Sequence, residues 1–140
     1  MSIQAVLLPL FVEVALTFVL LFWMARLNVA AVRSGTVRSQ DIALREPNWP
    51  ARNRQIQNAY HNQLELPTLF YVLTILSIVL RHADLLFVLL AWVFVALRCL
   101  QAFVDVTDND VPRRGALFLA GALVLAVMWA VFALRILLGI

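Results

Sequence analysis

The chain alternates four long apolar segments with shorter polar ones. The apolar segments lie at about residues 5–27, 62–81, 84–104 and 115–138. Each is close to the ~20 residues that an α-helix needs to cross a bilayer. They are too long for membrane strands, and they lack the two-residue alternation that such strands show. The pattern therefore predicts an all-α membrane protein built as a four-helix transmembrane bundle.

Polar residues at the ends lengthen three of these segments. The predicted spans cover about 5–27, 54–81, 84–107 and 113–138. Together they form one domain, residues 1–140, with a sizeable loop at about 28–53. Pro47 and Pro50 disfavour helix in this loop, and Trp49 between them suits the lipid headgroup region. Two interpretations stay open, a basic connector at the membrane surface and a lid over an anionic ligand.

The first apolar segment differs from a secretory signal peptide. Its apolar stretch is longer than the ~7–15 residues of a signal core, and no positive charge precedes it. We therefore expect it to remain in the protein as a membrane span.

Composition agrees with lipid as the solvent. Hydrophobic residues make up 64% of the chain and charged residues 14%, and the mean hydropathy is +0.91. A soluble domain of 140 residues has too little interior to hide that much apolar surface. The single cysteine, Cys99, excludes an internal disulfide and a multi-cysteine metal site. With only His61 and His82 besides, we expect no metal site.

The arginines predict the orientation of the chain in the membrane. Those around the first loop are Arg26, Arg33, Arg38, Arg45, Arg52 and Arg54. Arg113 and Arg114 follow the third span, whereas the turn after the second span has only Arg81, balanced by Asp84. The positive-inside rule then places the first and third loops in the cytoplasm and both termini on the other side.

Polar residues on the second span recur at helical spacing. They are Arg54, Asn58, His61, Asn62 and Glu65. Residues three or four apart share one face of a helix, so these side chains form a polar stripe at the cytoplasmic end of the span. Pro67 cannot donate to the carbonyl one turn back, which predicts a kink near residues 61–63.

A second polar stripe lies on the third span. It consists of Arg98, Gln101, Asp105 and Asp108. We expect Arg98 to form an ion pair with Glu65 inside the membrane. Two interpretations stay open: the stripes hold helices together, or they line a site whose arginines, including Arg113 and Arg114, bind an anionic ligand.

Glu13 lies deep in the first span, about three turns from its basic end. An intramembrane carboxylate is a candidate functional group. Its distance from the polar stripes favours a structural interpretation, in which it is protonated or bonds a neighbouring helix.

The motifs resemble the MAPEG family, the membrane-associated proteins in eicosanoid and glutathione metabolism. The resemblance rests on the run NAYHNQLELP and, further on, ALRCLQAFVDVTDNDVPRRGALFLAG. The second span of the family carries Arg-Ala-x-x-Asn-x-x-Glu with a proline shortly after. The positions that match are Ala59, Asn62, Glu65 and Pro67. Arg98 and Gln101 match the arginine motif of the third span, and Arg114 matches the arginine that opens the fourth. Asn58 stands where the family has arginine.

The resemblance implies a homotrimer of four-helix subunits that binds glutathione, as co-substrate, between neighbouring subunits. The implied glutathione-binding residues are Arg54, Asn58, His61, Asn62, Glu65, Arg98, Gln101 and Arg113. Arg114 is implied as the catalytic residue that stabilises the thiolate. Membrane lipid, a lipophilic small molecule and further copies of the chain are the expected partners, and nucleic acid is not.

Two functions from different classes therefore stay open. The first is a glutathione-dependent transferase or peroxidase acting on lipophilic electrophiles. The second is a non-catalytic membrane protein with a binding or scaffolding role that keeps the same fold. A proton pathway through Glu13, Glu65 and Asp105 is a third and weaker hypothesis, because these residues do not form a continuous line.

Overall fold

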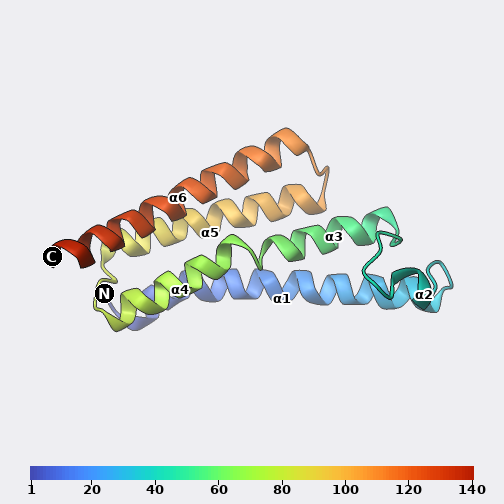
Figure 1. The fold of residues 1–140 in the computed structure, drawn as a ribbon, viewed down its shortest axis with the longest axis horizontal. Helices are drawn as coiled ribbons and strands as arrows, with labels where there is room; N and C mark the ends of the chain where they lie inside the picture. The colour runs from blue at the N-terminus through green and yellow to red at the C-terminus, as the bar shows by residue number, and fades with distance from the viewer.

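The computed structural model describes residues 1–140, and its regular structure is entirely helical (Figure 1). The helices are α1 (Ile3–Arg33), α2 (Ser39–Ile42), α3 (Ala51–Asn62), α4 (Leu66–Val79), α5 (Leu85–Val106) and α6 (Val111–Leu138). Four helical segments are long and apolar enough to cross a membrane, with α3 and α4 together forming the second. The all-helical prediction with four spans is therefore confirmed.

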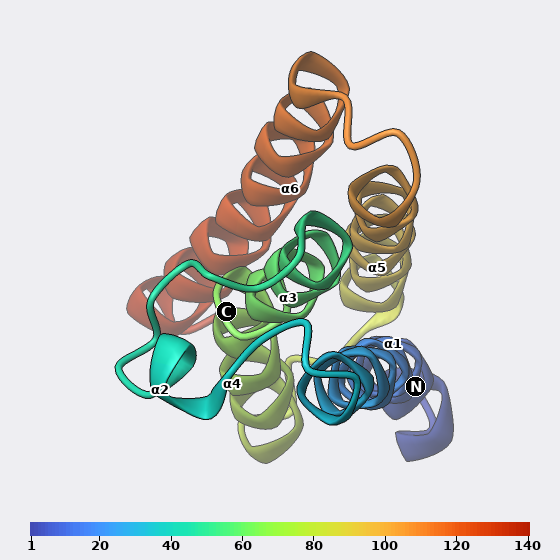
Figure 2. The same cartoon turned by 90° about the vertical axis from the view of Figure 1, so that its right-hand side faces the viewer.

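The four spans form an up-and-down bundle. Helix α1 lies beside α3 and α4, which run back along it, and α5 and α6 form a hairpin (Figure 1). Both termini lie at the same end of the bundle as the turn between α4 and α5. The long loop with α2 and the turn between α5 and α6 lie at the other end. Viewed along the bundle, the first half of α6 stands away from α1 (Figure 2).

The second span, in which a kink near residues 61–63 was predicted, is interrupted just after that point. Helix α3 ends at Asn62, and α4 begins at Leu66 with Pro67 in its first turn. Pro67 has no N–H for the carbonyl of Gln63, so an unbroken helix would lose that bond. The backbone N–H of Gln63 donates to the Tyr60 carbonyl, three residues back, at 2.9 Å. A short break therefore separates α3 from α4, which continues in the same general direction, about halfway along the bundle (Figure 1).

Side chains take up carbonyls that this interruption leaves open. The amide nitrogen of the Gln63 side chain donates to the Ala59 carbonyl at 3.1 Å, and the Thr68 hydroxyl donates to the Leu64 carbonyl at 2.8 Å. Unpaired backbone groups are costly in a membrane, where water cannot replace the missing partner. These two bonds make the interruption tolerable inside the bilayer.

The apolar core gathers around α5. Phe70 of α4 and Phe94 of α5 are both fully buried, and their ring centroids lie 5.0 Å apart. Small residues allow α5 to approach its neighbours: Ala91 is fully buried, and a Cβ added at Gly121 of α6 would lie 3.9 Å from Phe94. Many large apolar side chains remain on the outside of the bundle, as expected for a surface that lipid covers.

An ion pair joins α5 and α6 at the end of the bundle that holds the termini. The Asp84 carboxylate caps α5 by accepting the Phe87 N–H at 3.0 Å, and it lies 2.7 Å from the Arg135 guanidinium. Burial alone would raise the pKa of Asp84, but these two donors outweigh it and hold that pKa below its ordinary value. An acid at a helix N-terminus and a base in a last turn also complement both helix dipoles.

We expect Asp84→Ala to lower the free energy of unfolding by about 1 kcal/mol, because the helix cap is lost. Asp84→Asn keeps a capping group and loses only the ion pair, so its effect should be smaller, below about 1 kcal/mol. Because folding lowers the pKa of Asp84, the contribution of its charge is present above about pH 4 and disappears as the pH falls through the folded-state value. Denaturation of detergent-purified protein at pH 7 and pH 3 measures both effects. If the free energies of unfolding of the wild type and Asp84→Asn still differ at pH 3 as they do at pH 7, the electrostatic explanation is contradicted.

Candidate functional site

A polar cavity of about 370 Å³ lies where α3, α5 and the start of α6 meet. It is lined by Asn58, His61, Asn62, Glu65, Gln101, Arg114, Gly115 and Phe118. Its volume falls in the range of small-molecule sites. Only one lining residue is hydrophobic, which is unusual for a cavity beside lipid-facing helices. The polar stripes of the second and third spans therefore face each other across a common space.

The structure separates the residues of the predicted glutathione site into three groups. Those that line the cavity are Asn58, His61, Asn62, Glu65 and Gln101, together with the catalytic candidate Arg114. Arg98 is fully buried behind the cavity wall. Arg54 lines a neighbouring cavity, and Arg113 is held by aspartates on the α5–α6 turn.

Arg98 does not form the predicted ion pair with Glu65. Its Nη2 donates to the Asn62 carbonyl at 2.6 Å, and its Nη1 donates to Oε1 of Gln101 at 2.9 Å. The interruption at the end of α3 explains the change, because the Asn62 carbonyl has no amide partner one turn on. A buried guanidinium satisfies this acceptor from α5, while Glu65 stays exposed at the cavity.

Asn62 also contacts α5 through its side chain. Its amide nitrogen donates to the Asp105 carboxylate at 3.2 Å. The buried Asp105 therefore lies behind the cavity lining, on the same face of α5 as Arg98 and Gln101. Its backbone carbonyl accepts a further bond, at 2.8 Å, from the Gln55 side chain of α3.

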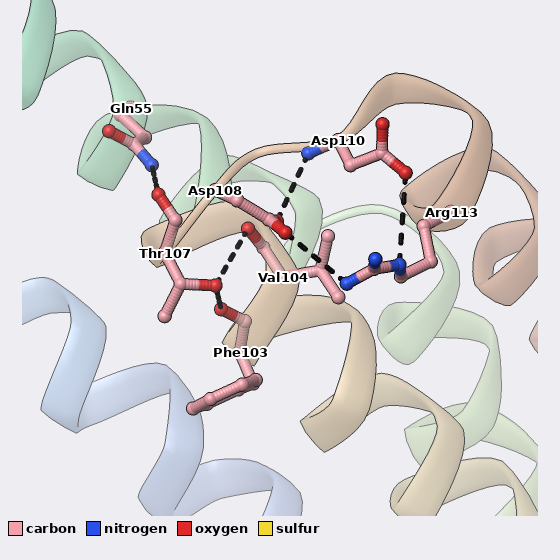
Figure 3. A network of polar contacts seen from close by, with 7 residues as sticks. All are labelled: Gln55, Phe103, Val104, Thr107, Asp108, Asp110 and Arg113. Carbon is pink, nitrogen blue, oxygen red and sulfur yellow. Dashed lines mark hydrogen bonds and ion pairs between the residues drawn. The ribbon is translucent and has the colours of Figure 1, made fainter.

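The two arginines at the start of α6 point to different partners. Arg113 donates to Asp108 at 3.2 Å and lies 3.7 Å from Asp110, and Figure 3 shows its guanidinium between these two carboxylates. Arg114 donates to the Asn109 side chain at 2.7 Å and lines the cavity. Arg114 is therefore the cation available to a ligand, and it lies in the first turn of a long helix, where the helix dipole favours negative charge.

Comparison with protein families gives one match. The model of the MAPEG family matches residues 6–134, nearly the whole chain. The chain belongs to the MAPEG family. No curated protein and no solved structure matches it. The family match confirms the resemblance seen in the motifs and, with the four apolar helices, an integral multi-pass membrane protein.

A second cavity of about 470 Å³ adjoins the first in this MAPEG protein. It shares Asn58 and His61 with the polar cavity, and Arg54 contributes to its wall. The long loop supplies further lining residues, which are Ile42, Arg45, Glu46, Pro47 and Trp49. Two side chains thus lie at the boundary of both cavities, and the loop encloses the outer one.

Amide side chains that the sequence motifs did not single out fasten α3 to its neighbours. Asn28 of α1 accepts bonds from the side chains of Asn53 and Gln57, at 3.1 and 3.2 Å. Gln55 donates to the Thr107 carbonyl at 2.8 Å as well as to α5 (Figure 3). Arg52 donates to the Val106 carbonyl. The feature of the sequence that indicates these contacts is the high content of asparagine and glutamine in residues 53–63. The family motifs include few of these positions.

Proposed function

We propose that this MAPEG protein binds glutathione in the polar cavity and uses it as the co-substrate of a transferase or peroxidase that acts on lipophilic electrophiles. Glutathione carries one ammonium group, two carboxylates and a thiol. The cavity offers one carboxylate, several amides and an arginine from three helices. This complementarity between the ligand and the exposed Glu65, with the half-buried Asn62 and Arg114, is the observation that carries the proposal.

Arg114 has the chemistry to activate the thiol. A nearby cation and the N-terminus of α6 both favour the thiolate over the thiol, and so lower the pKa of a bound cysteine. The thiolate is the reactive nucleophile. In a transferase it attacks an electrophilic carbon, forms a thioether and either displaces a leaving group or adds to the substrate, which then takes up a proton.

A peroxidase would use the same thiolate differently. The sulfur attacks one peroxide oxygen, the O–O bond breaks, and the departing alkoxide takes up a proton to become an alcohol. A second glutathione then reduces the resulting sulfenic acid, which gives glutathione disulfide and water. Phe118 in the cavity wall and the apolar outer surface of the bundle suit a lipophilic second substrate that arrives from the membrane.

The non-catalytic alternative is favoured by the charge around the site. Asn58 replaces the arginine of the family motif, so one ligand-binding cation is missing from the cavity. Arg113 is paired with Asp108 and Asp110, and Asp105 places a further carboxylate against the cavity-lining Asn62. A membrane protein that binds a polar molecule or holds partners together, without thiol chemistry, would tolerate these changes.

Glu65→Gln should weaken glutathione binding about tenfold or more, because a charge-assisted bond to the amino group is lost. Asp108→Asn is the matched control, since it removes one carboxylate outside the cavity. Titration calorimetry of the detergent-purified protein gives both affinities. Equal loss in the two variants, or no loss in either, would remove Glu65 from the binding site.

Arg114→Ala should reduce the thiolate absorbance of bound glutathione more than it reduces affinity. At a pH below that of half-ionisation, losing a neighbouring cation is expected to lower the thiolate fraction about tenfold. Arg113→Ala is the matched control, because this neighbour faces the aspartates. A wild-type protein that binds glutathione without thiolate absorbance would favour the binding or scaffold function over the enzyme.

We further propose a homotrimer, with glutathione between subunits and with the first and third loops in the cytoplasm. The family resemblance supports the assembly, and the distribution of arginines supports the orientation. Native mass spectrometry from detergent should give a mass of three chains. A monomer that retains glutathione binding would contradict a site between subunits.

A further inference from the structure

Glu13 of α1 is the buried charged group that the proposed chemistry does not use. It is fully buried, and neither of its carboxylate oxygens has a hydrogen-bond partner. Only its backbone carbonyl is engaged, by the Thr17 hydroxyl at 3.0 Å. A carboxylate in such a place is costly unless a charge compensates it. The sequence alone placed it far from the polar stripes.

The surroundings of Glu13 contain one cation. The titratable groups within electrostatic reach are Arg98 and Cys99 on α5 and Tyr71 on α4. Arg98 is the charge that acts on Glu13, and Glu13 is in turn the strongest of the charges that act on Arg98. The guanidinium Nε of Arg98 is also buried without a partner. The two unpartnered groups thus belong to one buried environment.

The other carboxylates near Arg98 are less suited to balance it. Asp105 is also buried; the side chain of Asn62 engages one of its oxygens, the other has no partner, and Asp105 acts on Arg98 less strongly than Glu13 does. Glu65 is exposed at the cavity. A guanidinium that is fully buried needs a counter-charge that is buried with it. Glu13 meets this condition, and it acts on Arg98 more strongly than the buried Asp105 does.

We propose that Glu13 is a positioning residue: its carboxylate is the counter-ion of Arg98, and through Arg98 it holds the interruption between α3 and α4 that presents Asn62 and Glu65 to the cavity. The connection runs through two hydrogen bonds that the guanidinium donates. Nη2 holds the Asn62 carbonyl at 2.6 Å, and Nη1 holds Gln101 at 2.9 Å. Both partners line the cavity. Without Glu13, the buried guanidinium lacks its counter-charge, and keeping it buried against these two partners costs more free energy.

A double-mutant cycle in the full-length protein tests the pairing without any ligand. Glu13→Gln and Arg98→Gln should each lower the Tm by roughly 5–15 °C, because each leaves an uncompensated buried charge. The double variant should lose clearly less than the sum of the two. Strictly additive Tm losses would overturn the proposal, because they would show that the two residues are not coupled. An unchanged Tm for Glu13→Gln would also overturn it, because a neutral glutamate tolerates replacement by glutamine. If a single variant is too unstable to purify, the double variant must still be recoverable, and its failure to fold would overturn the proposal equally.

Amide hydrogen exchange tests the positioning role. Glu13→Gln should accelerate exchange about tenfold or more in residues 62–66 while leaving the end of α6 unchanged, because opening is local to the interruption. Glu13→Asp, which keeps the charge, should restore most of the protection. Thr17→Val, one turn along α1, is the matched control and should have no effect there. Equal exchange in Glu13→Gln and wild type would overturn the proposal.

The link to ligand binding rests on the proposed function and is measured separately. If the wild type binds glutathione, Glu13→Gln should bind it about tenfold more weakly, and Glu13→Asp should bind it nearly as well as wild type. Unchanged affinity in Glu13→Gln would overturn the positioning role. If the wild type binds no glutathione, the proposed function fails, and the double-mutant cycle and the exchange data still decide the role of Glu13.

Discussion

The capture of the Asn62 carbonyl by Arg98 is the interaction on which the arrangement of this site depends. Pro67 removes one backbone hydrogen bond from the second span, and the interruption beside it leaves backbone acceptors without partners inside a bundle of apolar helices. In lipid such groups must find partners within the protein. A guanidinium from α5 supplies one, and a buried guanidinium in turn requires acceptors. Each of the two costly groups therefore compensates for the other, and together they fix α3 against α5.

This contact decides which side chains remain available for chemistry. Because Arg98 is occupied by Asn62 and Gln101, Glu65 stays exposed to the cavity. The turn between α5 and α6 makes a similar separation: two aspartates hold Arg113, and Arg114 remains at the cavity beside a helix N-terminus. The cavity of this protein is thus lined by one carboxylate and one arginine. This is fewer cations than the family motif carries, because Asn58 stands in place of an arginine.

The two ends of the bundle differ in how they are held together. At the end with the termini, the ion pair of Asp84 and Arg135 joins α5 to α6. At the other end the first half of α6 stands away from α1 (Figure 2), and amide side chains of α3 bind α1 and the end of α5 instead. The polar cavity lies in this half, where polar groups connect the helices alongside a small apolar cluster of Leu20, Ala59 and Ala102.

Much of this protein was determined by the sequence. Segment length and hydropathy determined four spans, the period of 3.6 residues determined which polar groups share a face, and Pro67 determined where the second span is interrupted. The run of motifs determined the family. These features depend on local geometry or on residue order, which a single chain displays directly.

Only the tertiary structure decided which faces meet. The spacing on one helix does not fix its rotation or its vertical position against another, so Arg98 was paired with Glu65 in the prediction and with Asn62 and Gln101 in the structure. For the same reason Glu13 was placed far from the polar stripes, although α1 packs it within electrostatic reach of Arg98. The choice between Arg113 and Arg114 depended on the path of one turn. Contacts between helices are set by packing and by the need to satisfy buried polar groups, and neither is visible along one helix alone.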